Sequence, residues 1–325
     1  GTLMRTSTRL LALALAGALL GACGQKDQNA PLAFVPADTP YVVANLAPLG
    51  HDARDTLLTQ ANTQLPGQLA QLDAAATRAE ARNDQDGARL LRALRAEFHS
   101  GSIEGFARDA GLDLDGHLAF YGLGLAPVLR IDLKDAKAFQ ALVTRLEKAS
   151  GSKLENAHEG AQAYRLGKFP ASGTELVIAT SEHQAVIALL PLDAPRPLLL
   201  EALGLDRPQH SLQDDGGLAR LARDKGYRDT LVGRIDFSRA LPLALGPDDA
   251  FVMARRKALA VAVAAETGEP VENQLKTDPT CADDAARIAA RVPALSFGYT
   301  RLDANHQDAG STSRWRRTSA PRSTS

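Results

Sequence analysis

The sequence predicts an α+β protein in which a mixed or antiparallel sheet is packed with helices. Short runs rich in strand-forming residues, each bounded by turn residues, recur through the chain. Between them lie segments whose apolar residues are three, four and seven positions apart, which is the period of amphipathic helices. The strand and helix patterns follow one another in blocks of similar shape, so a duplicated unit remains open as part of this prediction.

The N-terminal part of the body is expected to contain a strand and a helical hairpin. Two prolines, Pro36 and Pro40, mark a turn before a run of strand-forming residues. Leucines then recur with helical spacing from residue 52 to residue 98, with breaks at Pro66-Gly67 and at Asn83-Asp84. We therefore expect an antiparallel helical hairpin at 52–98 that packs on the sheet.

The centre of the chain alternates most clearly between strands and helices. Strand patterns at 118–122 and 128–133 precede a helix at 136–149. Three more strands follow, and the polar link Ser181-Glu182-His183-Gln184 between the last two suits a hairpin. These strands are expected at 163–169, 175–180 and 185–190.

Capping residues define the elements that follow. Ser211, with Asp214 three residues later, is expected to cap a helix that ends at Gly226. The next elements are a strand at 230–237, helices at 246–266 and from Thr280, and a strand at 294–302. We assign residues 34–240 to the α+β body, and 241–309 to a helical segment and strand of the same or a second, incomplete domain.

The first residues of the chain predict export. Arg5 and Arg9 precede thirteen uncharged residues, and the stretch ends in Leu20-Gly21-Ala22-Cys23. A basic start, a short apolar core and small residues before a cut site describe a secretory signal peptide, here residues 1–22. The apolar core is shorter than the ~20 residues that a membrane-spanning helix needs.

The Leu20-Gly21-Ala22-Cys23 ending resembles the lipobox of bacterial lipoproteins. The resemblance implies that Cys23 is diacylated on its sulfur, that the peptide before it is removed and that the new amino terminus is acylated. The membrane is then a partner through the lipid on Cys23, and residues 23–33 form a lipidated tether. In enterobacterial lipoproteins an Asp after the cysteine retains the protein at the inner membrane. Gly24 therefore implies the bacterial outer membrane, facing the periplasm, with the inner membrane as the alternative.

A second resemblance concerns the body. The Pro36–Pro40 turn before an apolar strand, the run 129–133 and the run 231–236 resemble an uncharacterised family of secreted bacterial proteins. The resemblance covers about residues 34–300. No activity is assigned to that family, so it implies no catalytic residue.

Charge and cysteine content narrow the range of partners. Within residues 23–309 the acidic side chains outnumber the basic ones. A mildly acidic body is poorly suited to a phosphate backbone, so no nucleic-acid partner is expected. If Cys23 carries lipid, Cys281 is the remaining cysteine, and no disulfide framework can be drawn.

Two glycine-containing motifs partly match known cofactor-binding or metal-binding loops. The stretch from Gly122 to Pro127 begins like a dinucleotide-binding loop, but a proline and a strand stand where the third glycine and a helix are required. Asp113, Asp115 and Gly116 suggest a calcium loop, yet the first and twelfth positions of that loop would be glycines. We therefore expect no cofactor and no metal site.

Several histidines and serines are candidate catalytic groups. His158-Glu159 lacks the second histidine of a zinc-binding HExxH motif. His210 and Ser211 are adjacent, which points their side chains apart, and Ser211 already has a capping role. Ser181 and His183 share a hairpin link whose polar residues need no catalytic explanation. We expect no catalytic residue, although triads assemble across distance and an enzyme stays open as an alternative.

The last sixteen residues differ from the rest of the chain. Residues 310–325 are rich in serine, threonine and arginine and show no strand or helix period, which predicts a disordered basic tail. Two explanations of this tail are open: a shifted reading frame, or a natural basic tail that touches anionic surfaces.

The sequence as a whole predicts a lipid-anchored cell-envelope protein with a non-catalytic, binding or structural role. Its partner would be an envelope protein or another envelope component. The first alternative is a hydrolase that acts on envelope material, and the second is a carrier of a small apolar ligand between the sheet and the helical hairpin. A broad exposed apolar patch favours the binding protein, a closed apolar cavity the carrier, and a cleft with converging Ser, His and acid groups the enzyme.

Overall fold

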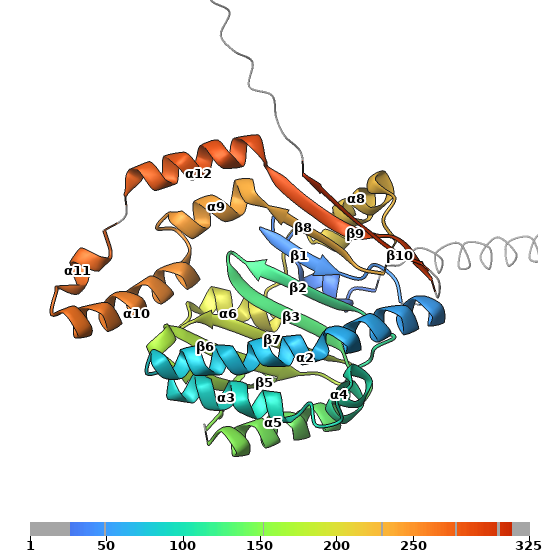
Figure 1. Cartoon of the computed structure of the whole chain (residues 1–325), viewed down its shortest axis with the longest axis horizontal. Coiled ribbons are helices and arrows are strands. Elements are labelled where there is room, and N and C mark those ends of the chain that lie inside the picture. The colour runs from blue at the N-terminus through green and yellow to red at the C-terminus, as the bar shows by residue number, and fades with distance from the viewer. Residues whose placement is uncertain are drawn as a thin grey trace, which may run out of the picture.

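The computed structural model describes residues 27–48, 50–151, 153–228, 230–276, 278–303 and 306–313. The predicted signal peptide and Cys23 lie outside these residues. The described chain confirms the α+β class: a ten-stranded antiparallel sheet with helices on both faces (Figure 1). The strand order is β10-β9-β8-β1-β2-β3-β7-β6-β5-β4.

Most strands lie within one or two residues of their predicted positions. β4 was not predicted, and neither was β10. The strands are β1 Tyr41–Ala44, β2 Leu118–Leu123, β3 Ala126–Asp132, β4 Glu155–Glu159, β5 Gln162–Phe169, β6 Thr174–Thr180, β7 Gln184–Pro191, β8 Val232–Asp236, β9 Ala294–Asp303 and β10 His306–Ser313.

The helices include the predicted hairpin, formed by α2 and α3, and several short helices that were not predicted. The helices are η1 Pro31–Phe34, α2 His51–Ala81, α3 Gln85–Ala96, α4 Ile103–Ala110, α5 Ala136–Ser150, η2 Pro170–Ser172, α6 Arg196–Leu203, α7 Leu212–Asp215, α8 Gly217–Lys225, α9 Phe237–Leu245, α10 Ala250–Thr267, α11 Val271–Gln274 and α12 Pro279–Arg291. Among the described residues, none of these helices is both long and apolar enough to span a membrane.

The expected break at Pro66-Gly67 is absent, and α2 continues through it. Proline lacks the N–H that would bond to the carbonyl four residues earlier, here that of Asn62. The side chain of Asn62 is held by the neighbouring helix α4: its Oδ1 accepts from Ile103 N at 2.8 Å and its Nδ2 donates to Glu104 at 2.8 Å. Packing against α4 therefore offsets the local cost of the proline.

The two faces of the sheet are covered to different extents. On the back face, η1, α6, α7 and α8 enclose a core that includes Val42, Tyr121 and Val232, all fully buried. On the front face, the side seen in Figure 1, α4 and α5 cover the β3–β7–β6 part through Phe139, Leu142 and their neighbours. The α2–α3 hairpin lies outside α5 on this front face (Figure 1).

The prediction left open whether residues 241–309 belong to the same domain as the body or to a second one. β9 lies between β8 and β10 in the same sheet as the body, so residues 241–309 belong to this domain and not to a second one. The prediction of a disordered tail from residue 310 is wrong for 310–313, which are part of β10. Backbone pairing with β9 orders these residues although their side chains are polar, as suits the edge of a sheet. Residues 314–325 lie outside the described chain.

The predicted tether at 23–33 is also shorter than expected. Asn29 O accepts from Gln184 Nε2 at 2.9 Å, and Asp27 O accepts from Gln213 Nε2 at 2.7 Å. Pro31–Phe34 then forms η1 against the back core. Residues 27–33 therefore belong to the folded body.

The blocks that suggested a duplicated unit differ in connectivity. After β3 and α5 the chain crosses to the far edge strand β4, and only the fourth strand of that meander, β7, returns to pair with β3. After β8 and its helices the chain returns at once to the adjacent strand, β9. The two blocks thus do not repeat one topology.

Candidate functional site

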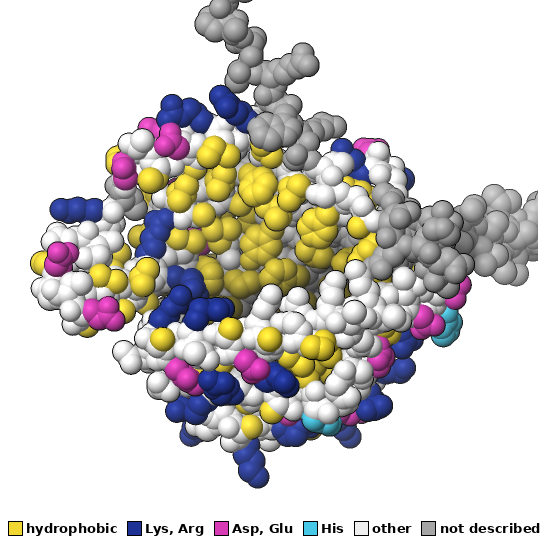
Figure 2. Space-filling view, in the orientation of Figure 1, with side chains coloured by type: hydrophobic (Ala, Val, Ile, Leu, Met, Phe, Trp, Pro, Cys, Tyr) yellow, Lys and Arg dark blue, Asp and Glu magenta, His cyan; other side chains and the backbone are white. Residues whose placement is uncertain are grey.

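The front face of the sheet carries an apolar hollow beyond the region that α5 covers. This name denotes six side chains from β1, β2, β8 and β9, and Val43 and Phe120 lie directly opposite each other at its centre. The rings of Tyr41 and Phe120 are in contact, with centroids 5.7 Å apart. Figure 2 shows hydrophobic side chains gathered here, in a depression between α2 on one side and α9 and α12 on the other. The six residues are Tyr41, Val43, Phe120, Ile235, Leu295 and Phe297.

On the back face of the same strands the side chains are buried, in contrast to those of the hollow. Val42, Ala44 and Tyr121 point to the back and are fully buried, whereas Phe120 is 41% exposed on the front. Helix α9, with the sequence FSRALPLAL, contacts β8 and β9 beside the hollow, and none of its residues is buried. Large contiguous apolar surfaces on folded proteins mark interaction sites. The hollow has the composition of such a site.

The borders of the hollow differ in charge. On the α2 side, residues 56–72 contain no charged side chain. On the α9 and α10 side, Figure 2 shows basic side chains beside the hydrophobic ones. Arg256 of α10 reaches α9, where its guanidinium donates to the carbonyl oxygens of Ala244 and Gly246, the latter at 3.0 Å. Within the described residues Arg256 forms no ion pair, so its positive charge stays available at this border.

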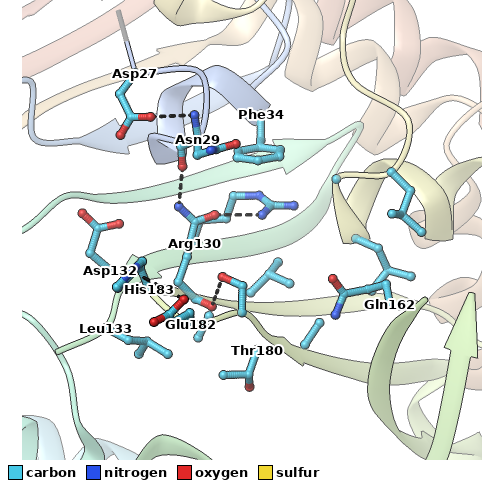
Figure 3. Close-up of a pocket in the computed structure, with 18 of the residues that line it drawn as sticks. Asp27, Asn29, Phe34, Arg130, Asp132, Leu133, Gln162, Thr180, Glu182 and His183 are labelled. Carbon is cyan, nitrogen blue, oxygen red and sulfur yellow. Dashed lines mark hydrogen bonds and ion pairs between the residues drawn. The ribbon is translucent and has the colours of Figure 1, made fainter. Parts of the chain in front are cut away.

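A second candidate is a polar pocket of about 740 Å³ at the β6–β7 turn (Figure 3). The buried guanidinium of Arg130 donates to Tyr121 Oη at 3.0 Å and to Ala202 O at 2.7 Å. It also donates to Gln184 Oε1 at 3.1 Å. The Phe34 ring stacks on Arg130, 4.0 Å from the ring centroid to Cζ, and Arg207 lies 4.2 Å from the same ring. These contacts hold the N-terminal segment on the body, so the cluster has a structural role.

Asp132, which lines the acidic side of this pocket, forms a pair with His117. His117 Nδ1 lies 3.5 Å from Asp132 Oδ2, and the same carboxylate oxygen accepts from the backbone N of His117 at 2.8 Å. The hydrogen bond to Asp132 raises the pKa of His117. Burial works to raise the pKa of Asp132, but the bonds from His117 outweigh it and the pKa is lowered. The pair joins the loop before β2 to the end of β3.

Ser181 and His183, which share the predicted hairpin link, both line this pocket, but they do not form a catalytic pair. The Ser181 hydroxyl donates to Gln184 O at 3.1 Å. His183 is exposed, and its contact with Glu182 is 3.9 Å long. General base catalysis needs a nucleophile within hydrogen-bond reach of the base. This arrangement therefore offers no activated nucleophile.

The other histidine and serine candidates are held in structural contacts. Ser211 Oγ accepts from Asp214 N at 3.1 Å, which confirms its predicted capping role. His210 O accepts from Ala37 N at 2.8 Å and fixes the N-terminal segment. His158 is exposed on β4, and the neighbouring Glu159 pairs with Arg196 at 3.3 Å.

The two glycine motifs form turns. Gly124, at φ +54°, makes the two-residue turn of the β2–β3 hairpin within the Gly122–Pro127 stretch. A side chain on Gly124 would collide with the carboxylate of Asp249. In the second motif, Asp113 Oδ1 accepts from Asp115 N at 3.0 Å and Asp115 pairs with Arg54 at 2.8 Å. Across the described ranges, no group of His, Cys, Asp and Glu could hold a metal ion.

The two cysteines lie in different parts of the chain. Cys281 is a free, exposed thiol on α12. Cys23, the predicted lipidation site, precedes the described residues.

Comparison with known protein families, curated proteins and solved structures finds no match for this chain. The functional proposal below therefore rests on the fold class and the surface geometry.

The sequence did not reveal the hollow, because its six residues come from segments up to 256 positions apart. The strand Tyr41–Ala44 has no charged residue on either side, a pattern typical of burial on both faces, so it gave no sign that one face is open.

Proposed function

We propose that this protein is a lipid-anchored cell-envelope protein that binds another envelope protein through the apolar hollow and catalyses no reaction. The hollow is the observation that carries the proposal, since a broad apolar surface open on one side suits a macromolecular partner. A small ligand instead needs a pocket that buries most of its surface. The outer membrane, facing the periplasm, is the proposed location, with the lipid on Cys23 as the anchor.

The proposed occupant is an amphipathic helix of the partner protein that carries an acidic residue. On the same sheet face, α5 already packs an amphipathic helix over β3, β7 and β6 through Phe139, Leu142 and Val143. The hollow continues that face with apolar side chains, and no helix of the described chain lies above them. Helix-in-groove binding uses this kind of surface, with apolar anchors one turn apart. An acidic residue at the α9–α10 end would complement Arg256.

Anchoring is compatible with access to the hollow. The docked segment begins at Asp27, four residues after Cys23, so the anchor lies within ~14 Å of the pocket at the β6–β7 turn. The hollow is formed by β1, β2, β8 and β9 and does not include that turn.

The test is photocrosslinking in intact cells from within the hollow. Phe120 is replaced by p-benzoylphenylalanine, and the matched control carries the same amino acid at Leu205, which is 50% exposed outside the hollow. We expect one discrete adduct with a second polypeptide from position 120 and none from position 205. Peptide mapping should place the crosslink in a helix with an acidic residue. Arg256→Glu should weaken this adduct and Arg256→Lys should retain it.

Other outcomes would overturn the proposal. An adduct with lipid alone would favour the carrier of an apolar ligand. An adduct only with a second copy of the chain would replace the partner by self-association. Equal crosslinking from both positions, or no dependence on the charge of residue 256, would show that the hollow is not a specific site.

A further inference from the structure

Helix α10 exposes a stripe of four side chains that is complementary to itself. Arg255, Leu259, Ala262 and Glu266 follow one another at spacings of four, three and four, which places them on one face of the helix. All four are exposed, and Leu259 is 62% exposed. The stripe thus has a positive end, an apolar centre and a negative end.

We propose that two copies of this chain associate through antiparallel packing of α10 against α10 of the second copy. In this arrangement Arg255 of each copy meets Glu266 of the other, and Leu259 meets Ala262. The contact is isologous, so each favourable pair occurs twice. This inference is independent of the partner proposed for the hollow.

Charge complementarity is the argument for a second copy as the occupant. Residues 250–265 carry three basic side chains, Arg255, Arg256 and Lys257, and no acidic one. The acidic residues begin at Glu266 and continue through Glu269 and Glu272. Glu266 is the one acidic residue within α10, and Glu269 and Glu272 follow the end of the helix. An antiparallel pair places the basic residues 255–257 of one helix near Glu266 of the other, whereas a parallel pair would place like charges together.

The stripe has no partner inside its own chain. Among the described residues neither Arg255 nor Glu266 forms an ion pair, and the only ring near Arg255 is Phe251, whose centroid lies 5.7 Å from Cζ. The buried side of α10 is a different one, represented by Ala260.

The position of α10 allows two anchored copies to meet. The N-terminal segment docks at the β6–β7 turn through Asn29 and Gln184. α10 contacts the opposite end of these strands, where Gly173 approaches the carbonyl of Ala254. On a lipid-anchored molecule the stripe would therefore lie away from the anchored end.

The test is the mass of the purified full chain in a non-ionic detergent, measured by light scattering with the detergent contribution subtracted. We expect concentration-dependent association to twice the mass of the single processed chain. Arg255→Glu removes two exposed ion pairs and creates two repulsions, so the dissociation constant should rise about tenfold or more. Glu266→Arg alone should have the same effect.

The charge swap separates this contact from a general loss of stability. Arg255→Glu combined with Glu266→Arg restores opposite charges in the antiparallel pair and should restore the dimer. Arg223→Glu, on the exposed side of α8, is the matched control and should leave the mass unchanged. A wild-type chain that stays monomeric at all concentrations, or a swap that stays as weak as the single variants, would overturn the proposal.

Discussion

The carboxylate of Asp249 accepts a hydrogen bond from Leu125 N at 3.0 Å, a contact between residues 124 positions apart. Its second oxygen accepts from Val252 N at 2.9 Å and so caps α10. Asp249 is buried, and the turn glycine Gly124 leaves the space that it occupies. One side chain thus fixes both the β2–β3 hairpin and the start of the helix that carries the self-complementary stripe.

Replacing Asp249 should therefore destabilise the fold locally and globally. Asp249→Ala removes an N-cap and a charged acceptor of a second backbone N–H, with an expected cost of about 2–4 kcal/mol in unfolding free energy. Asp249→Asn keeps one acceptor oxygen and should lose about half as much. Urea unfolding measures the cost, and limited proteolysis should show earlier cleavage in α10. A variant with wild-type stability would contradict the role of this side chain.

The Phe34 ring provides a matched pair of arginine substitutions. Arg130→Met leaves Tyr121 Oη and Ala202 O without their donor in a buried site, which should cost about 2–4 kcal/mol. Arg207→Met removes an exposed guanidinium that stacks on Phe34 and donates to Gln28 O and to Asn29 Oδ1, the latter at 3.0 Å. Because these contacts are exposed to solvent, the loss should be less than about 1 kcal/mol. Thermal unfolding of both variants compares the two. Equal losses would contradict the larger contribution expected from the buried hydrogen bonds of Arg130.

Stability should depend on pH through His117. Its pKa is raised by the hydrogen bond to Asp132, so its contribution is fully present below the unfolded pKa of 6.5 and is lost as pH rises through the folded pKa. The difference in melting temperature between wild type and His117→Gln should be larger at about pH 5.5 than at about pH 8.5. His183→Gln, at an exposed position, is the matched control. A difference that grows with rising pH would show that the sign is wrong.

Lipid attachment should depend on one residue. Cys23→Ala removes the only sulfur within the lipobox-like ending and should abolish acylation and leave an unprocessed precursor. Labelling with a radioactive fatty acid compares the variant with wild type, and Cys281→Ala is the control because that thiol lies on α12. Equal labelling of the Cys23→Ala variant and wild type would refute the anchor.

Local signals in the sequence determined most of the secondary structure. The leucine spacing of the α2–α3 hairpin, the Ser211 cap and the Ser181–Gln184 link are short-range patterns, and their physical causes act within a few residues. The short helices α4, α6 and α9 were not predicted, because about two turns contain too few residues to show a clear helical period. β4 was not predicted because its sequence, ENAHE, is polar, and it becomes a strand only by pairing with β5.

The candidate sites depended on tertiary structure. The capping role predicted for Ser211 is correct, because capping geometry is local. It could not show the hollow: the strand Tyr41–Ala44 is apolar on both sides and is typical of a strand buried on both faces. Which face receives helices is decided by long-range packing. α6, α7 and α8 cover Val42, while no helix of the described chain covers Phe120.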